Sequence, residues 1–328
     1  MATTQVTVNV GPTMLDIAKA NGSDGIAGLI DQTIRVAPEL QIGFARTIKG
    51  QNYKTLVRTA LPAIGFRDAN QGMAGVKSTY ENKMVETFIL DPKISVDKAV
   101  ADQYEDGAEA YIALEADAIM KAALQLLGKT FYYGKRYAYT GDSNPNSATG
   151  KARGFYGLLD FVDSSLIYDC QGSAVGTSNW RTSVWGVKFG PADVAWVYGE
   201  DGQLAMLPTR VGDAPDANGN FFTAYISQLM AYPGLQMVQQ FSVGRIKNIT
   251  DESTHGLTDK VLGSWLAQFP AAYTPDVIFA SRKAIESLRA SRTATNVTGT
   301  PAPSPTDYEG IPIVKTDSLS AVEGSDIA

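Results

Sequence analysis

Few side chains in this sequence have the type and spacing that catalysis or metal binding requires. His255 is the only histidine among 328 residues, and it lies in the polar stretch Asp251–Leu257. A serine triad would need this histidine as its general base, and no serine stands in a GxSxG turn. A zinc site built on histidines would lack its further histidine ligands. The pattern therefore favours a surface histidine over a catalytic or metal-binding one.

The sequence offers equally few cysteine or carboxylate residues in arrangements that catalysis or metal binding requires. Cys170 is the only cysteine, which excludes an intramolecular disulfide and a multi-cysteine metal site and fits folding in the cytosol. We expect a buried, inert thiol there. The acidic stretch Asp213–Asn220 lacks the glutamate that ends an EF-hand loop, so a plain turn is favoured over a calcium site. Phosphate-binding glycine motifs are missing as well. We predict no catalytic residue, no metal site, no cofactor and no enzymatic activity.

Composition narrows the class of protein further. The chain is 44% hydrophobic, which supports a substantial core, and its net charge of −6 comes without any basic run. Binding to nucleic acid through phosphates needs clustered lysine and arginine, so a protein that grips DNA is disfavoured, although one that encloses DNA is not. No apolar run approaches the roughly 20 residues of a membrane span, and the first ten residues lack the features of a signal peptide. We expect a soluble, unexported protein with no membrane partner.

The longest helical pattern runs from Asp97 to Tyr133. Within it we predict a main helix from Asp106 to Leu127, about 33 Å long at 1.5 Å per residue. Gly128 and Lys129 would end it, because glycine suits the left-handed cap and lysine suits the helix C-terminus. Apolar residues recur every three, four or seven positions and indicate one buried face; they are Ala108, Ile112, Ile119, Ala122, Ala123, Leu126 and Leu127.

The apolar segments within the first 43 residues are too short and too often interrupted to form a hydrophobic core of their own. We predict a short helix over Pro12–Ala20 and an amphipathic helix over Gly25–Val36, which Pro38 ends. Two interpretations stay open. The two helices could dock on their own domain, or residues 1–43 could form an arm that packs on a neighbouring subunit.

Residues 44–92 have an unusual pattern. Two β-like runs, Tyr53–Ala60 and Tyr80–Leu90, flank a long stretch rich in glycine and proline. That connection is much longer than the usual hairpin loop of about 2–5 residues. A projecting hairpin whose partners lie on another chain explains both features. Candidate contacts between subunits are Arg58, Arg67, Asn70 and Lys77, and the alternative is that these polar side chains are simply solvated.

The remaining chain reads as mixed α/β. Val184–Val197 is predicted to form two strands joined at Gly190-Pro191. We also predict strands over Phe221–Leu229, Gln236–Ile249, Pro275–Ala280 and Ile311–Thr316, helices over Asp259–Phe269 and Arg282–Ala290, and a flexible loop over Ser291–Asp307. Ser281 is placed to cap the second helix, whose Ile285 and Leu288 would face inwards.

The segment RTALPAIGFRDANQGMAGVKST resembles the hairpin motif of one branch of tailed-phage major capsid proteins, chiefly from short-tailed phages. Further matching segments follow in order along the chain: FYYG at 131–134, GFYGL at 154–158, VWGVKFGP at 184–191 and EGIPI at 309–313. The matching residues of the hairpin motif are Arg58, Thr59, Leu61, Pro62, Phe66, Arg67, Asn70, Gly72, Lys77, Ser78 and Thr79.

This resemblance implies the Hong Kong 97 phage capsid fold, an α+β fold. It implies an N-terminal arm (1–43), an extended β-hairpin loop (44–92) and a peripheral domain with a long spine helix (93–150). A mainly axial domain with connecting strands (151–270) and a mixed axial and peripheral return (271–328) would follow.

A structural virion protein is implied as well, one that self-assembles in the host cytoplasm into hexamers and pentamers of an icosahedral capsid around double-stranded DNA. Its expected partners are copies of itself, a scaffolding protein, a portal and a decoration protein, with no sequence-specific DNA binding. The alternatives are another virion protein, such as a tail tube, or a soluble α/β enzyme.

Overall fold

The computed structural model describes residues 12–21, 31, 33, 35–134, 154–172, 178–202, 205–216, 219–252, 254–296 and 300–323. The chain forms two compact units, each assembled from three separate stretches. The first unit collects Met1–Val36, Ile89–Leu127 and Gln203–Tyr232, and the second collects Ala37–Phe88, Gly128–Gly202 and Pro233–Ala328. Within the described ranges, no helix has the length and apolar character that crossing a membrane would need.

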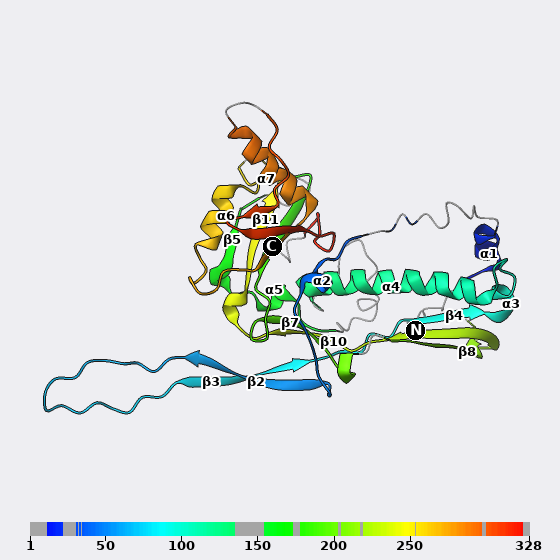
Figure 1. The fold of residues 1–328 in the computed structure, drawn as a ribbon, viewed down its shortest axis with the longest axis horizontal. Helices are drawn as coiled ribbons and strands as arrows, with labels where there is room; N and C mark the ends of the chain where they lie inside the picture. The colour runs from blue at the N-terminus through cyan, green and yellow to red at the C-terminus, as the bar shows by residue number, and fades with distance from the viewer. Residues whose placement is uncertain are drawn as a thin grey trace, which may run out of the picture. The chain divides into compact units, whose positions relative to one another are not determined.

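The first unit is built on an antiparallel sheet in the order β4–β9–β8. Its strands are β4 (Lys93–Asp97), β8 (Ala205–Pro215) and β9 (Phe221–Met230). Helices α1 (Met14–Ala20), α3 (Lys98–Ala101) and α4 (Ala108–Tyr133) supply the other side of the core, and Figure 1 shows α4 running along the strands. The buried residues that join sheet and helices are Ile17, Ile94, Val96, Ala101 and Tyr111.

The stretch Asp213–Asn220, for which the sequence favours a plain turn over a calcium site, includes the end of β8 and leads into β9. Asp216 Oδ1 accepts a hydrogen bond from the backbone N–H of Asn220 (2.8 Å) and so closes the turn. Asp213 lies inside β8, and Asn218 lies outside the described residues. The predicted strand over Phe221–Leu229 is confirmed as β9.

The predicted helix over Gly25–Val36 is wrong where the structure describes it. Asp31, Thr33, Arg35 and Val36 are not helical, while Gly25–Ile30 lie outside the described residues. Asp31 Oδ1 accepts hydrogen bonds from both the backbone N–H and the hydroxyl of Thr33 (2.8 and 2.7 Å). Such local side-chain bonds compete with the helical backbone pattern, which explains the error. The short helix predicted over Pro12–Ala20 is confirmed as α1.

Helix α4 is longer than predicted and does not end at Gly128. It begins at Ala108 and continues to Tyr133, so Gly128 is an interior residue. A Cβ at Gly128 would meet Ser318 Oγ and would lie 2.9 Å from Ala37 Cβ, which shows that glycine is needed here for close packing. Gly134 ends the helix instead, with φ at +62° and its N–H bonded to Thr130 O (2.9 Å).

The second unit contains a six-stranded mixed sheet in the order β13–β14–β12–β6–β11–β5. The central strand β6 (Arg181–Val187) is buried along its whole length. The other strands are β5 (Ile167–Asp169), β11 (Val243–Thr250), β12 (Val277–Ala280), β13 (Asp307–Tyr308) and β14 (Ile311–Lys315). Helices α6 (Asp259–Leu266) and α7 (Arg282–Ala294) contribute to its core, in which Trp265 and Leu288 are fully buried.

Two smaller sheets complete the second unit. One has the order β1–β7–β10, with β1 (Ala45–Thr47), β7 (Val194–Tyr198) and β10 (Pro233–Met237). The other is the two-stranded hairpin of β2 (Asn52–Ala60) and β3 (Thr79–Glu86). The short helices are α2 (Glu39–Ile42) and α5 (Leu158–Phe161), and the single 3-10 turns are Ser164–Leu166, Glu200–Gly202 and Gln240–Ser242.

The single strand predicted over Gln236–Ile249 is wrong. The chain forms β10 and then β11, which belong to different sheets, and the turn Gln240–Ser242 separates them. Ser242 makes this break by donating its hydroxyl to Asp193 Oδ1 (2.6 Å) and its N–H to Gln239 O (3.1 Å). The alternating apolar pattern over Gln236–Ile249 thus belongs to two separate buried strands, which explains why it resembles one long strand.

The C-terminal predictions are mostly confirmed. Ser281 caps α7 by accepting a hydrogen bond from Ala284 N (3.3 Å), and Ile285 and Leu288 are buried. The predicted loop over Ser291–Asp307 begins too early, because α7 continues to Ala294. Arg289 Nε donates to Ala302 O (2.8 Å), a bond that fastens the following segment to the helix.

Candidate assembly surfaces

The hairpin of β2 and β3 is the most exposed element of the second unit. Its ladder runs from the pair Asn52 and Glu86 to the pair Ala60 and Thr79, with one shift in register near the far end. The connecting segment Leu61–Ser78, here called the distal loop, contains no helix or strand. Figure 1 shows it as a wide cyan loop that continues in the direction of the two strands.

The hairpin exposes most of its large apolar side chains, although Val85 on β3 is buried. Phe66 is fully exposed and Ile64 is 87% exposed. Isolated two-stranded ribbons are only marginally stable in water, and contiguous exposed apolar surface marks an interaction site. The other exposed apolar residues of the hairpin are Leu56, Leu61, Met73, Val76, Tyr80 and Met84.

All four residues predicted to contact another subunit lie on this hairpin and are exposed. The guanidinium of Arg58 lies 5.6 Å from the ring centroid of Tyr80, and Arg67 Nη1 donates to Gln71 O (2.8 Å). Asn70 occupies the left-handed region with φ at +62°, which asparagine tolerates in turns. In the described hairpin, no hydrogen bond or ion pair joins Arg58, Arg67, Asn70 or Lys77 to another of the four. Their role in subunit contacts stays a prediction.

The base of the hairpin, in contrast, is firmly attached to the second unit. Tyr53 Oη donates to Gln236 Oε1, and the guanidinium of Arg46 lies 4.4 Å from the Tyr53 ring centroid. Burial raises the pKa of Tyr53 and keeps its hydroxyl protonated as a donor. On the other strand, Lys83 Nζ donates to Val238 O (3.3 Å) and lies 4.8 Å from the Phe161 ring centroid. Only the distal part of the hairpin is left without such support.

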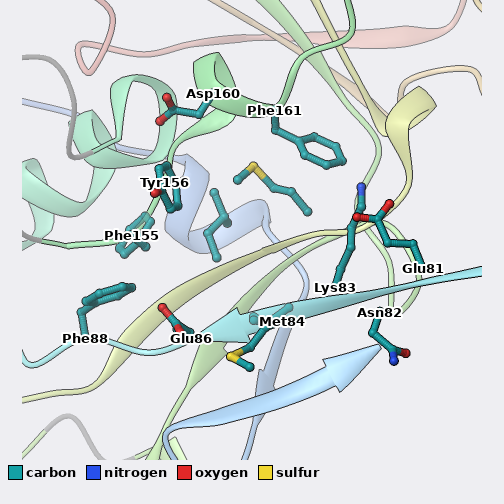
Figure 2. Close-up of a pocket in the computed structure, with 13 residues that line it drawn as sticks. Glu81, Asn82, Lys83, Met84, Glu86, Phe88, Phe155, Tyr156, Asp160 and Phe161 are labelled. Atoms are coloured by element: carbon teal, nitrogen blue, oxygen red, sulfur yellow. The ribbon is translucent and has the colours of Figure 1, made fainter. Parts of the chain in front are cut away.

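A groove lies beside β3 at this base (Figure 2) and is here called the base groove. Its volume is about 410 Å³, within the range of roughly 300–1,000 Å³ that is usual for ligand pockets. Its walls contain aromatic and methionine side chains together with charged ones. The lining residues are Glu81, Asn82, Lys83, Met84, Val85, Glu86, Phe88, Phe155, Tyr156, Asp160, Phe161, Leu235 and Met237.

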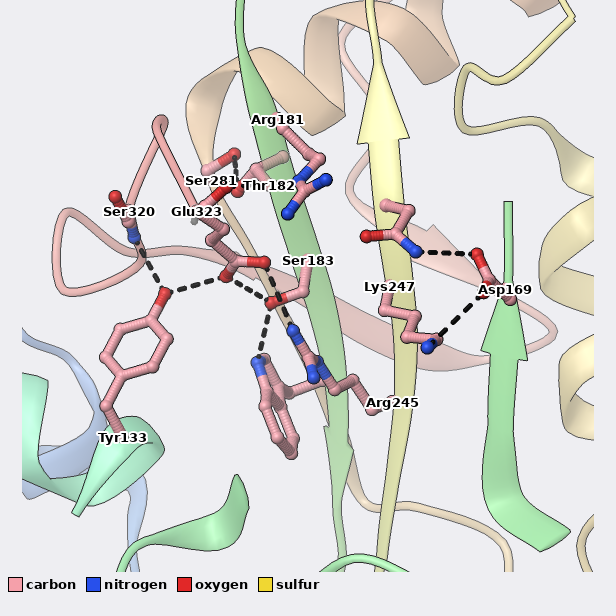
Figure 3. Close-up of polar contacts among 12 residues, drawn as sticks. Tyr133, Asp169, Arg181, Thr182, Ser183, Arg245, Lys247, Ser281, Ser320 and Glu323 are labelled. Carbon is pink, nitrogen blue, oxygen red and sulfur yellow. Dashed lines mark hydrogen bonds and ion pairs between the residues drawn. The ribbon is translucent and has the colours of Figure 1, made fainter. Parts of the chain in front are cut away.

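Two consecutive tyrosines at the end of α4 hold two buried glutamates. Tyr132 Oη donates to Glu39 Oε1 (2.7 Å), and Tyr133 Oη donates to Glu323 Oε1 (2.8 Å). Figure 3 shows the second contact, in which Ser183 Oγ and Arg245 Nη2 also donate to Glu323 (2.6 and 3.2 Å). The end of the helix is therefore bonded both to Glu39 in α2 and to Glu323, the last of the described residues.

Sequence reasoning missed this pair of buried carboxylates. Glutamate is rarely buried unless it is paired or fully hydrogen-bonded, and no local pattern around Glu39 or Glu323 announces either condition. The partners Tyr132 and Tyr133 lie far away along the chain.

The residues with possible chemistry do not form a reactive site. Cys170 is buried, and burial, with a smaller contribution from the Asp169 charge, raises the pKa of its thiol to about 12. His255 is partly buried, with Nδ1 2.6 Å from Cys170 O and Nε2 3.6 Å from Glu252 Oε2. Among the described residues, no group of three or more histidine, cysteine, aspartate or glutamate side chains could hold a metal ion.

These features, an extended hairpin, a long helix and two units built from interleaved segments, agree with a family match. A family model described as major capsid protein GP7 matches residues 40–325. The chain belongs to this family. It is a tailed-phage major capsid protein, a structural protein of the capsid shell and not an enzyme.

One solved structure supports the fold of this capsid protein. A chain of bacteriophage Epsilon15 matches with a TM-score of 0.70 and 23% identity over 100% of both chains. That likeness confirms the predicted α+β fold of Hong Kong 97 type. The SrpI encapsulin of Synechococcus elongatus (TM-score 0.46, 9% identity, 74% of this chain and 96% of that one) and the bacteriophage JBD30 capsid (0.46, 9%, 94% and 99%) also match. No curated protein matches the sequence.

Proposed function

We propose that this major capsid protein assembles into hexamers and pentamers, and that these close an icosahedral shell around packaged double-stranded DNA. The observation that carries the proposal is the hairpin, whose apolar side chains are exposed and whose base alone is bonded to its own unit. Such a ribbon gains stability when another chain covers it.

The hairpin would act as the strap between neighbouring subunits. Arg58, Arg67, Asn70 and Lys77 would provide its polar contacts, while Phe66 and Ile64 would provide apolar ones. Each exposed ion pair contributes little by itself. Repetition of one contact around a closed symmetric ring, however, makes many modest contacts act together.

The proposed contact with DNA is enclosure without specific binding. A chain with a net charge of −6 and no basic run does not neutralise many phosphates. Weak attraction at the inner face would allow DNA to be packed densely and released again. A strongly positive inner surface in an assembled particle would contradict this part of the proposal.

The remaining proposals concern domains and partners. Residues 1–43 would form the arm, 44–92 the hairpin loop and 93–150 the peripheral domain with the spine helix. Residues 151–270 would form mainly the axial domain, and 271–328 would return through both domains. A scaffolding protein, a portal and a decoration protein would join the chain during assembly in the host cytoplasm.

The test compares the native chain with a variant that has a shortened hairpin. Because Ala60 and Thr79 pair at the end of the ladder, Asn-Gly can replace Leu61–Ser78 and close a two-residue turn. We expect closed shells, hexamers or pentamers of the native chain in negative-stain electron microscopy and light scattering. The variant should keep its circular dichroism spectrum but remain monomeric. A native chain that forms only monomers or open tubes would refute the proposal.

A further inference from the structure

The chain ahead of Ala37 is fastened to the first unit, beginning at α1. Ile17 is 2% exposed and belongs to the same buried cluster as Tyr111 of α4. Directly after α1, Asn21 donates its side-chain N–H to Gln103 O and accepts a hydrogen bond from Glu105 N (both 3.1 Å), which ties it to the turn before α4. The described residues 13–21, 31, 33, 35 and 36 are here called the clasp.

Further along, the clasp contacts α4 itself. Lys121 Nζ donates to Asp31 Oδ2 (2.9 Å), and Gln125 Nε2 donates to Thr33 O (3.0 Å). Asp31 and Thr33 are two residues apart and so span at most about 7 Å. Lys121 and Gln125 are one helical turn apart, a rise of about 6 Å. The two contacts therefore match in order and in spacing, as expected for a segment that follows the helix in the same direction.

Lys121 is shared between two carboxylates that differ in exposure. Its ammonium lies 2.9 Å from Asp31 Oδ2 and 2.6 Å from Asp117 Oδ2, and the Asp31 side chain is 17% exposed whereas that of Asp117 is 56% exposed. Partly buried ion pairs are screened less by salt than exposed ones. Hydrogen bonds from Thr33 and from Lys121 lower the pKa of Asp31 to about 2, so its carboxylate is charged at neutral pH.

We infer that the clasp binds the spine helix of its own chain and stays there when copies of the chain assemble, so that the covered face of α4 is closed to other chains. The covalent tether keeps the clasp beside its own helix at an effective concentration on the order of millimolar. Exchange with a neighbouring copy would also have to withdraw Ile17 from the core. The inference refines the arm of the proposed capsid subunit, but it does not require that capsomers form.

Isotope-coded cross-linking tests this assignment on the full, unsubstituted chain. Unassembled chains labelled with light or heavy nitrogen would be mixed in equal amounts, allowed to assemble and treated with a water-soluble carbodiimide, which joins a carboxylate and an amine in contact through an amide bond. We expect the link between Asp31 and Lys121, identified by mass spectrometry of tryptic peptides, to carry a single label, light or heavy. Links with mixed labels at this pair would overturn the inference.

Controls within the same sample make each result decisive. The pair Lys98 and Asp102, 2.7 Å apart one helical turn from each other, reports whether the reagent works. If that link forms and the link between Asp31 and Lys121 does not, the clasp is not on α4 and the inference fails. Mixed labels at other links show that both kinds of chain share a particle. In a chain that stays monomeric, a link between Asp31 and Lys121 would support the clasp although the proposed function fails.

A matched pair of variants provides an independent readout. Asp31→Asn removes the carboxylate of the clasp, whereas Asp117→Asn removes a carboxylate from the same lysine without touching the clasp. Trypsin cleavage after Arg35, an exposed residue of the clasp, reports how often the clasp opens. We expect Asp31→Asn to speed this cleavage by about threefold, the effect of one partly exposed ion pair, and Asp117→Asn to leave it unchanged. Equal rates in both variants would show that Asp31 does not hold the clasp.

Discussion

At the scale of single residues, the two buried glutamates differ in how their charge is compensated. Glu323 has a cation, Arg245, at 3.2 Å in addition to its hydroxyl donors. The side chain of Glu39 is bonded by three hydroxyl groups, those of Tyr132, Thr316 and Ser318. Burial raises the pKa of Glu39 above its ordinary value, although these hydrogen bonds oppose the shift. The protonated carboxyl is therefore the form that folding favours.

This direction fixes how Glu39 affects stability as pH changes. Because the pKa of Glu39 is raised in the folded state, this residue contributes its full amount to the free energy of unfolding below the ordinary glutamate pKa of about 4.3. That contribution is lost as pH rises through the pKa of the folded state. We predict that the thermal midpoint of the native chain, relative to that of Glu39→Gln, increases as pH falls from about 7 to about 5. Differential scanning calorimetry at several pH values would measure it.

A matched variant separates charge from packing. Glutamine keeps the size of Glu39 and an acceptor for Tyr132, so Glu39→Gln should unfold near the native temperature at neutral pH. Glu39→Ala removes the acceptor from three buried hydroxyls and should cost at least about 2 kcal/mol at every pH. A constant difference between the native chain and Glu39→Gln across the pH range would contradict the assigned shift.

At the scale of elements, helix α4 depends on a glycine that intrinsic propensity disfavours. Alanine in a helix interior is normally better than glycine by about 1 kcal/mol. At Gly128, however, a Cβ would lie 2.9 Å from Ala37 Cβ and would also meet Ser318 Oγ. We predict that Gly128→Ala lowers the free energy of unfolding by about 1–2 kcal/mol, because overpacking outweighs the gain in propensity.

Gly263 in α6 offers the control for this prediction. A Cβ at Gly263 would lie 2.8 Å from Tyr308 Oη, which is closer than an ordinary van der Waals contact. This oxygen is the far end of a flexible side chain and can move away. Gly263→Ala should therefore cost less than Gly128→Ala, as measured by thermal or urea unfolding. A Gly128→Ala chain as stable as the native one would show that Ala37 and Ser318 can move away.

Local patterns explain which elements the sequence predicts well. The sequence predicts the hairpin strands and α7 because alternating residues, a serine cap and helical spacing are properties of neighbouring residues. The second predicted strand, Tyr80–Leu90, is too long, since β3 ends at Glu86. The predicted helix end at Gly128 is wrong because a glycine cap and a closely packed glycine look alike in sequence. What distinguishes them is Ser318, nearly two hundred positions away.

Only part of the candidate assembly surface can be predicted from the sequence. Exposed loop residues such as Arg67 could be proposed because the long connection has no buried pattern of its own. The base groove could not, since it joins β3 to Phe155 and Phe161 from a distant segment. The groove forms where these distant segments come together, and residue spacing along the sequence does not predict which distant segments meet.

At the scale of the whole molecule, charge is unevenly distributed. The chain has a net charge of −6, yet the segment from Arg58 to Thr79 has an excess of cations. The rest of the chain is therefore more acidic than the total suggests. If the hairpin contacts a neighbouring subunit as proposed, its basic segment and the acidic remainder of the next copy would favour head-to-tail order over other orders.

We predict that reversing the charge of the strap abolishes assembly, whereas reversing the same number of charges elsewhere does not. The first variant combines Arg58→Glu, Arg67→Glu and Lys77→Glu, and the control combines Arg210→Glu, Lys260→Glu and Arg282→Glu at exposed positions outside the hairpin. Both change the net charge by the same amount, so general repulsion between subunits is matched. Light scattering against protein concentration would give the onset of particle formation for each chain.

Salt dependence identifies the electrostatic part of this effect. The screening length falls from about 10 Å at 0.1 M to about 3 Å at 1 M ionic strength. The native chain and the control should therefore need more protein to assemble in concentrated sodium chloride, because exposed charge pairs at the strap are weakened. The strap variant has no such attraction to lose. If the control variant loses assembly to the same extent as the strap variant, total charge governs assembly and the strap has no special role.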